Sequence, residues 1–145
     1  MVYNELMKVV LHDESKYMIR FDRGDEVVSG LKQFAVEKGI RAAVFSGIGA
    51  TDEILVSWFH PDEKKYHDHH LTKKFEIVNL NGNITILNDE PIVHAHGSFS
   101  DVELHGRSGH VKKLIVSATC EIFLQTIEGE IIRGFDPDSG LHLMQ

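Results

Sequence analysis

Apolar residues recur at helical spacing in one stretch near the start of the chain. The residues before it, Asp22 to Glu26, offer a capping aspartate and acidic side chains for a first turn. Gly39 follows it, where a glycine commonly ends a helix in the left-handed conformation. The pattern predicts one principal helix over about residues 25–38, with an apolar face made of Val27, Leu31, Phe34 and Ala35.

Elsewhere the apolar positions alternate with polar ones or form short runs bounded by turn residues, which is typical of β-strands. The pair Asn81-Gly82 is a strong hairpin signal, so we expect the chain to turn or bulge there. Many hairpin-linked strands after one helix predict an α+β fold with a mainly antiparallel sheet, in a single domain over residues 1–145. The expected strands are residues 6–11, 17–21, 41–46, 52–60, 75–80, 84–87, 91–100, 114–127 and 131–133.

Length and composition indicate where in the cell the protein is found. The N-terminus lacks a basic region followed by an apolar run, so we expect no signal peptide. No stretch approaches the roughly 18 apolar residues of a membrane span. The single cysteine, Cys120, lies in an apolar run, and we predict a buried strand residue in a cytoplasmic protein.

The net charge of −7 argues against binding DNA or RNA through the phosphates alone. Three lysine pairs are the candidates for a local basic patch, although such pairs commonly lie on solvated strand edges. They are Lys64-Lys65, Lys73-Lys74 and Lys112-Lys113.

Four of the ten histidines fall within seventeen residues, in the pattern H-x-H-x8-H-x4-H from His94 to His110. In a strand, residues i and i+2 point to the same face, so His94 and His96 present two imidazoles side by side. We expect a turn at residues 106–109 to bring His110 back beside them. Three imidazoles with an open fourth position suit zinc, and they also suit iron, nickel or copper.

Other interpretations of the histidines remain open. A pair at i and i+2 can lie on a solvated sheet face without a metal. His105 is either a group behind the ligands or an exposed loop histidine. His67, His69 and His70 form a second cluster, for which we expect an exposed loop.

Seven segments occur in an order that resembles a stand-alone prokaryotic PPC (plants and prokaryotes conserved) domain over nearly the whole chain. They are Arg20-Phe21-Asp22-x-Gly24-Asp25, Phe45-Ser46-Gly47-Ile48-Gly49-Ala50, residues 75–84, His94-x-His96 with residues 98–101, Gly109-His110-Val111, Thr119-Cys120-Glu121-Ile122 and Phe135-Asp136-x-x-Ser139-Gly140-Leu141.

The resemblance implies a homotrimer whose histidines at positions 94, 96 and 110 bind zinc. Family members usually have Gly-Gly-His where this chain has Ser108-Gly109-His110, a departure that leaves the ligand in place. Plant relatives are nuclear DNA-binding proteins that contact DNA through a separate R-G-R-P hook, which this sequence lacks. The DNA-binding label therefore transfers poorly, whereas oligomerisation and partner contacts could transfer.

The H-x-H strand and Gly-His turn are also similar, more distantly, to the zinc site of acetolactate decarboxylase. By that analogy a metal would act as a Lewis acid on a small carbonyl compound. Candidate groups for proton transfer are Glu76 and Glu121, and candidates for binding a carboxylate are Arg20 and Arg133.

Three hypotheses follow from these patterns. The first is a trimeric metal-binding domain that acts through protein or DNA-associated interaction without turnover. The second is a zinc-dependent lyase or ester hydrolase. The third is a trimer whose histidines are structural or incidental.

Overall fold

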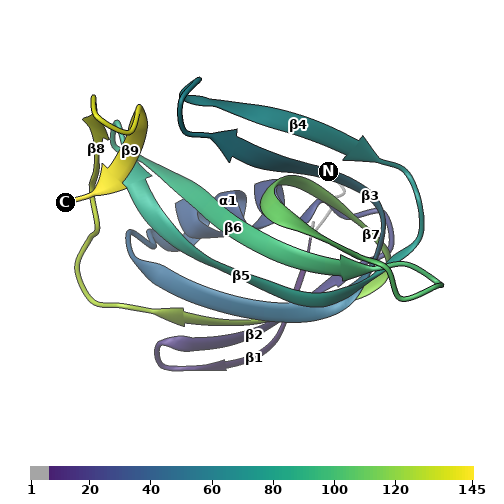
Figure 1. The fold of residues 1–145 in the computed structure, drawn as a ribbon. Coiled ribbons are helices and arrows are strands. Elements are labelled where there is room, and N and C mark those ends of the chain that lie inside the picture. The colour runs from purple at the N-terminus through teal and green to yellow at the C-terminus, as the bar shows by residue number, and fades with distance from the viewer. Residues whose placement is uncertain (1–6) are drawn as a thin grey trace.

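The computed structural model describes residues 7–145 as one helix and a set of antiparallel strands (Figure 1). This confirms the α+β fold with a mainly antiparallel sheet. Within the described residues, the helix is too short to cross a bilayer. The elements are β1 (Lys8–Asp13), β2 (Lys16–Asp22), α1 (Val27–Lys38), β3 (Ala43–His60), β4 (Lys65–Leu71), β5 (Phe75–Leu87), β6 (Glu90–Ser100), β7 (Gly106–Thr126), β8 (Arg133–Asp136) and β9 (Leu141–Met144).

Seven strands form one sheet in the order β1-β2-β7-β6-β5-β3-β4, and β3 also pairs with β7. The two pairings of β3 make the sheet curl back on itself, and Figure 1 shows α1 behind the curved strands β5 and β6. The helix packs against β6 and β7. A separate hairpin of β8 and β9 lies near one end of β6 (Figure 1).

The hydrophobic core lies between α1 and the inner face of the sheet. Leu31 and Phe34 of the helix join buried residues from β2, β3, β5, β6 and β7 in one cluster. Strand β5 shows how the faces separate, because Leu80 and Ile84 are buried there while Asn79 and Asn81 are exposed. This alternation leaves a polar outer face on β5, next to the histidines of β6.

The predicted helix over about residues 25–38 is confirmed as α1, Val27–Lys38, but its N-cap is Glu26 and not an aspartate. Its carboxylate accepts hydrogen bonds from the backbone N–H of Val28 at 3.0 Å and of Ser29 at 2.7 Å. It also accepts one from the N–H of Leu114 in β7 at 2.9 Å. Asp25 instead accepts from the N–H of Asp22. Glu26 therefore fixes the helix to the central strand as well as capping it.

We expect Glu26→Ala to lower the free energy of unfolding by about 2 kcal/mol, because it removes a cap and leaves the partly buried Leu114 N–H without its partner. Urea unfolding followed by circular dichroism measures the change. Glu37→Ala is the matched control, since Glu37 is exposed and accepts only from Gln33 one turn away. Equal stability of the two variants would contradict the role of Glu26.

The predicted turn or bulge at Asn81-Gly82 is wrong, because β5 runs without interruption from Phe75 to Leu87 and its register with β6 shifts earlier, between Ile77 and Asn79. Gly82 serves close packing there: a Cβ at this position would collide with the carbonyl oxygen of His94 and the ring of Phe45. The two strands predicted at residues 41–46 and 52–60 are likewise one strand, β3, whose register shifts between Gly47 and Gly49. Cys120 is buried as predicted, and burial raises the pKa of its thiol to about 12.

Candidate metal centre

Three imidazole rings meet on the outer face of the sheet. His94 and His96 are two residues apart on β6, and His110 on β7 lies directly opposite His96 in the strand register. The ring centroids are 5.2 Å apart for His94 and His96, 5.2 Å for His94 and His110, and 5.4 Å for His96 and His110. One nitrogen from each ring can be chosen so that all three lie within 4.8 Å of one another.

The turn that brings β7 back beside β6 lies at residues 101–105, earlier than the predicted turn at residues 106–109. Asp101 holds it, because its Oδ1 accepts from the N–H groups of Glu103 and His105, both at 3.0 Å. Lys73 donates to Oδ2 at 3.0 Å and, with the two backbone donors, lowers the pKa of Asp101 to about 2. A carboxylate that stays ionised fixes the register in which His110 faces His96.

Burial and nearby positive charge lower the pKa of two of the rings, His94 and His110, and so favour the neutral form, which is the form that binds metals. Burial lowers the pKa of His110 to about 4, with further contributions from His94, His96 and Lys112. Burial, Arg133 and His96 lower the pKa of His94. Nδ1 of His110 is buried and has no hydrogen-bond partner among the described residues. An orphaned ring nitrogen of this kind is a natural place for a metal ligand bond.

The lowered pKa of His110 predicts a pH dependence of stability in metal-free protein. Unfolded chains take up a proton near pH 6.5, whereas the folded ring stays neutral to about pH 4. The contribution of this ring to the free energy of unfolding is therefore fully present above pH 6.5 and is lost as the pH falls towards 4. We expect urea unfolding midpoints to fall over this window in wild type, and to fall less in His110→Gln. Parallel pH profiles for the two proteins would contradict this.

Arg133 of β8 borders the three rings on one side. Its guanidinium donates to Thr85 Oγ1 at 2.8 Å, to Asn83 Oδ1 at 3.0 Å and to the carbonyl of His142 at 2.9 Å. Nη2 lies 3.3 Å from Nδ1 of His94. Since a guanidinium has no acceptor, His94 Nδ1 accepts this bond and the ring proton is on Nε2. A metal bound at Nδ1 of His94 would replace the bond from Arg133, and a metal bound at Nε2 would replace the ring proton.

Tyr66 of β4 borders the rings on another side, and sequence reasoning did not single it out. Its ring lies 4.7 Å from that of His110, centroid to centroid, and Lys112 Nζ lies 5.0 Å from the Tyr66 centroid. Lys112 and Ser57 both donate to Asp68, at 2.7 Å and 2.6 Å. This network anchors β4 beside the histidines, so residues 65–71 form a strand and not the predicted loop.

The remaining predicted residues lie apart from the three rings. His105 is exposed and within 3.4 Å of Glu103 in the Asp101 turn. Glu76 is exposed opposite Ser100, and Glu121 lies opposite Arg20, whose guanidinium pairs with Asp22 at 2.7 Å. In the cluster on β4, the rings of His67 and His70 contact Glu63 and Glu53 at 2.8 Å and 3.1 Å.

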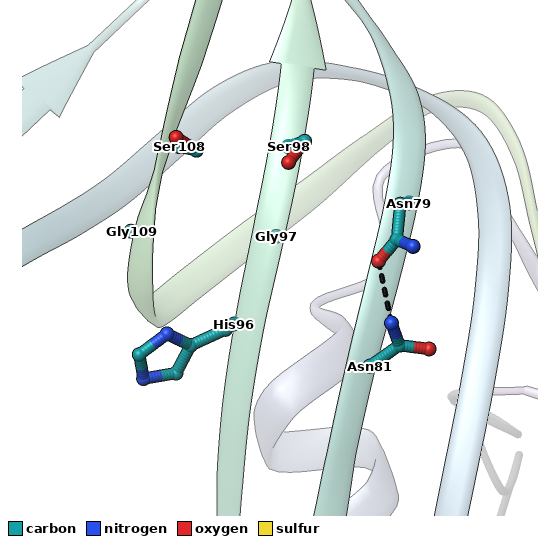
Figure 2. Close-up of a pocket in the computed structure, with 7 residues that line it drawn as sticks. All are labelled: Asn79, Asn81, His96, Gly97, Ser98, Ser108 and Gly109. Atoms are coloured by element: carbon teal, nitrogen blue, oxygen red, sulfur yellow. Dashed lines mark hydrogen bonds between the residues drawn. The ribbon is translucent and has the colours of Figure 1, made fainter.

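A hollow of about 270 Å³ opens beside His96 (Figure 2). Asn79 and Asn81 of β5 and Ser98 and Ser108 of the two following strands line it, on the same face as His96. The amide of Asn81 donates to Oδ1 of Asn79 at 2.7 Å. The alternation of Asn79, Asn81 and Asn83 with apolar residues was the sequence signal for this polar surface, and the hairpin interpretation obscured it.

The donor set fits a transition-metal ion. Tetrahedral zinc, with Zn–N bonds of about 2.0–2.1 Å, separates its ligand nitrogens by about 3.3 Å. The three rings, with nitrogens within 4.8 Å, would have to rotate inward to reach that spacing. They supply three imidazole ligands. The two cationic neighbours are held by oxygen acceptors, Arg133 by Thr85 and Asn83 and Lys112 by Asp68.

The sequence matches the family description "Plants and Prokaryotes Conserved (PCC) domain" over residues 11–128. Among solved structures, a "putative DNA binding protein" from Bacteroides thetaiotaomicron is 28% identical with a TM-score of 0.92, covering 97% of both chains. A metal-containing protein from Archaeoglobus fulgidus is 28% identical with a TM-score of 0.85, covering 96% of this chain and 97% of the other. A plant- and prokaryote-conserved protein from Pyrococcus horikoshii is 30% identical with a TM-score of 0.84, covering 100% and 97%.

A comparison with curated proteins finds no match. A more distant structural likeness supports the predicted relation in fold to acetolactate decarboxylase. The enzyme from Bacillus subtilis is 12% identical with a TM-score of 0.54, and the match covers 84% of this chain and 57% of that one. At this identity the likeness shows a shared fold and carries no activity.

Proposed function

Because the chain belongs to the Plants and Prokaryotes Conserved domain family, we propose that it is a homotrimeric domain that binds a divalent metal, zinc, through His94, His96 and His110 and acts through contacts with protein or DNA-associated partners. The observation that carries the proposal is the convergence of three imidazoles, one of which has a buried nitrogen without a partner among the described residues. The metal content of a similar archaeal protein supports it.

The chain's own residues prepare the site for a metal. The strand register places His96 against His110, and Arg133 and Tyr66 limit how far His94 and His110 can rotate. Side chains that hold ligating histidines in place raise metal affinity, since less ordering remains for the binding step. When bound, zinc would supply an open coordination position that polarises a donor atom of a ligand.

An apolar strip on the outer sheet face supports assembly. Leu11, Met18 and Phe123 lie in one cross-strand row over β1, β2 and β7, with exposed fractions of 61%, 39% and 39%. Ile48 and Val78 continue it, and Met18, Ile48, Val78 and Phe123 line a second hollow of about 320 Å³. Exposed apolar side chains that lie together on one face mark interaction surfaces. The trimeric state follows the resemblance to stand-alone members of the family.

We expect no binding to a short duplex at a salt concentration of about 0.15 M. The net charge is −7, and each of the three predicted lysine pairs has a lysine in an ion pair. The ion pairs are Lys65 with Glu63, Lys73 with Asp101, Lys112 with Asp68 and Lys113 with Glu53. Fluorescence anisotropy of labelled DNA measures this. Saturable binding at that salt would favour a direct role on DNA over a role in protein contacts.

The proposal is tested by elemental analysis of protein purified without a histidine tag. Near-stoichiometric zinc in wild type, lost from a variant with alanine at positions 94 and 96, supports the metal site. Protein that holds no metal from cells or after incubation with zinc overturns it.

A second candidate is a zinc-dependent lyase or ester hydrolase acting on a small carbonyl compound. The observation that favours it is Arg133, a partly desolvated guanidinium next to His94, where a substrate carboxylate could pair with it. A metal in the site would polarise the carbonyl. Turnover of 2-oxo or ester compounds by zinc-loaded wild type, abolished in His96→Ala with the trimer intact, would establish an enzyme.

A further inference from the structure

The hollow beside His96 is lined by neutral polar groups, whereas the His94 side of the site carries the cation Arg133. Its walls are Asn79, Asn81, Ser98 and Ser108, with Gly97 and Gly109 between the rows, and within residues 7–145 the His96 ring is the only ionisable group that lines it. The nearby cation, Arg133, is on the side of His94 and is bound to Asn83 and Thr85. A ligand group that fills the hollow is therefore met by neutral hydrogen-bonding partners.

The hydrogen-bonding capacity of these walls is largely unused. The bond from Asn81 Nδ2 to Asn79 Oδ1 orients both amides and leaves the Asn79 amine and the Asn81 carbonyl for a ligand. Ser98 and Ser108 are exposed and line the hollow, so their hydroxyls are open to a ligand. Donors and acceptors are therefore both present on these walls, on the two joined amides of β5 and the serines of the neighbouring strands (Figure 2).

The strand register sets these groups out in two rows. Asn81, His96 and His110 form the first, and Asn79, Ser98 and Ser108 form the second. Neighbouring strands lie about 4.8 Å apart, so a ligand that reaches the histidines can contact the second row with its next few atoms. The volume of about 270 Å³ suits a small compound.

From this arrangement we infer that the hollow is a subsite for the neutral, polyhydroxylated segment of a small ligand whose other end binds the metal. Hydroxyl groups both donate and accept, which matches the mixed walls. A carboxylate or phosphate in the same place would find no cation there, and an alkyl chain would leave four polar groups without partners. The inference rests on the proposed metal site.

The test uses two hydroxamic acids that share a metal-chelating end and a six-carbon chain. Gluconohydroxamic acid carries hydroxyl groups along the chain, and hexanohydroxamic acid carries none. Isothermal titration calorimetry is performed on zinc-loaded protein after its zinc content has been measured. We expect the hydroxylated compound to bind about tenfold more tightly or better, as two or more net hydrogen bonds would give.

A double variant, Ser98→Ala with Ser108→Ala, should lose most of this preference while keeping its zinc and its affinity for the alkyl compound. Ser100→Ala is the matched control, since Ser100 is two residues further along the same strand and does not line the hollow. Equal affinity of wild type for both compounds, or a preference unchanged in the double variant, would overturn the subsite alone. A wild type that holds no zinc would overturn the metal proposal as well.

Discussion

We expect alanine at both His94 and His96 to lower the zinc content of the protein from about one ion per chain to a trace, because a single imidazole from His110 remains. Zinc sites with four ligands bind with roughly 10–16 kcal/mol in total, or roughly 3 kcal/mol per ligand. Losing two ligands therefore weakens binding by about four orders of magnitude. Elemental analysis of untagged, dialysed protein measures the loss.

The chain supplies a matched control for this experiment. His67 and His69 on β4 repeat the H-x-H spacing, and their rings lie outside the group of three. His67→Ala with His69→Ala should keep its zinc. Equal loss in both double variants would mean that exposed histidines scavenge metal, and unchanged zinc in the His94 and His96 variant would place the ion elsewhere. Thermal unfolding of each variant checks that the fold persists.

The parts of the site that follow from local geometry could be predicted from the sequence. Alternation in a strand places His94 and His96 on one face, and the structure bears this out. The return of His110 was also expected, although Asp101 makes the turn and not the glycines that follow. A short polar segment between two strands can reverse the chain at either of the two turn positions. The pairing of the strands that carry His96 and His110 was therefore easier to predict than the residues of the turn.

Two errors arose where a tertiary contact overrode a local preference. Asn81-Gly82 favours a hairpin in isolation, but the glycine is required for close approach of β6 and the ring of Phe45. Aspartate is the better cap in isolation, but the longer Glu26 side chain reaches both the helix and the N–H of Leu114. In both cases the deciding partner is in a strand distant in sequence.

The sequence offered Arg133 as a candidate for binding a carboxylate but did not place it beside His94, and it gave no indication of Tyr66. Arg133 is 39 residues from His94 and reaches it because the β8–β9 hairpin lies against β5. Tyr66 reaches His110 because β4 pairs with the end of β3. Neither contact with the histidines has a local signal in the sequence, since both depend on the curl of the sheet.

The apolar strip on the outer face leads to the prediction with the largest expected effect on assembly. We expect Phe123→Asp to convert a trimer into monomers at micromolar concentration. Phe123 lies between Met18 on β2 and Ser46 on β3, in the middle of the strip. An unpaired carboxylate buried in each interface costs several kcal/mol, and every chain in the ring contributes one. Sedimentation velocity measures the change in mass.

Val36→Asp is the control, because Val36 is an exposed apolar residue of α1, at 58%, outside the strip. It should leave the mass unchanged, which separates the loss of one interface from a general effect of added charge. A monomeric wild type would contradict the proposed assembly, and a Phe123→Asp protein that stays trimeric would move the interface to another face. Because Asn79 and Asn81 border both hollows, zinc content measured on the monomeric variant also shows whether the metal site needs the assembled face.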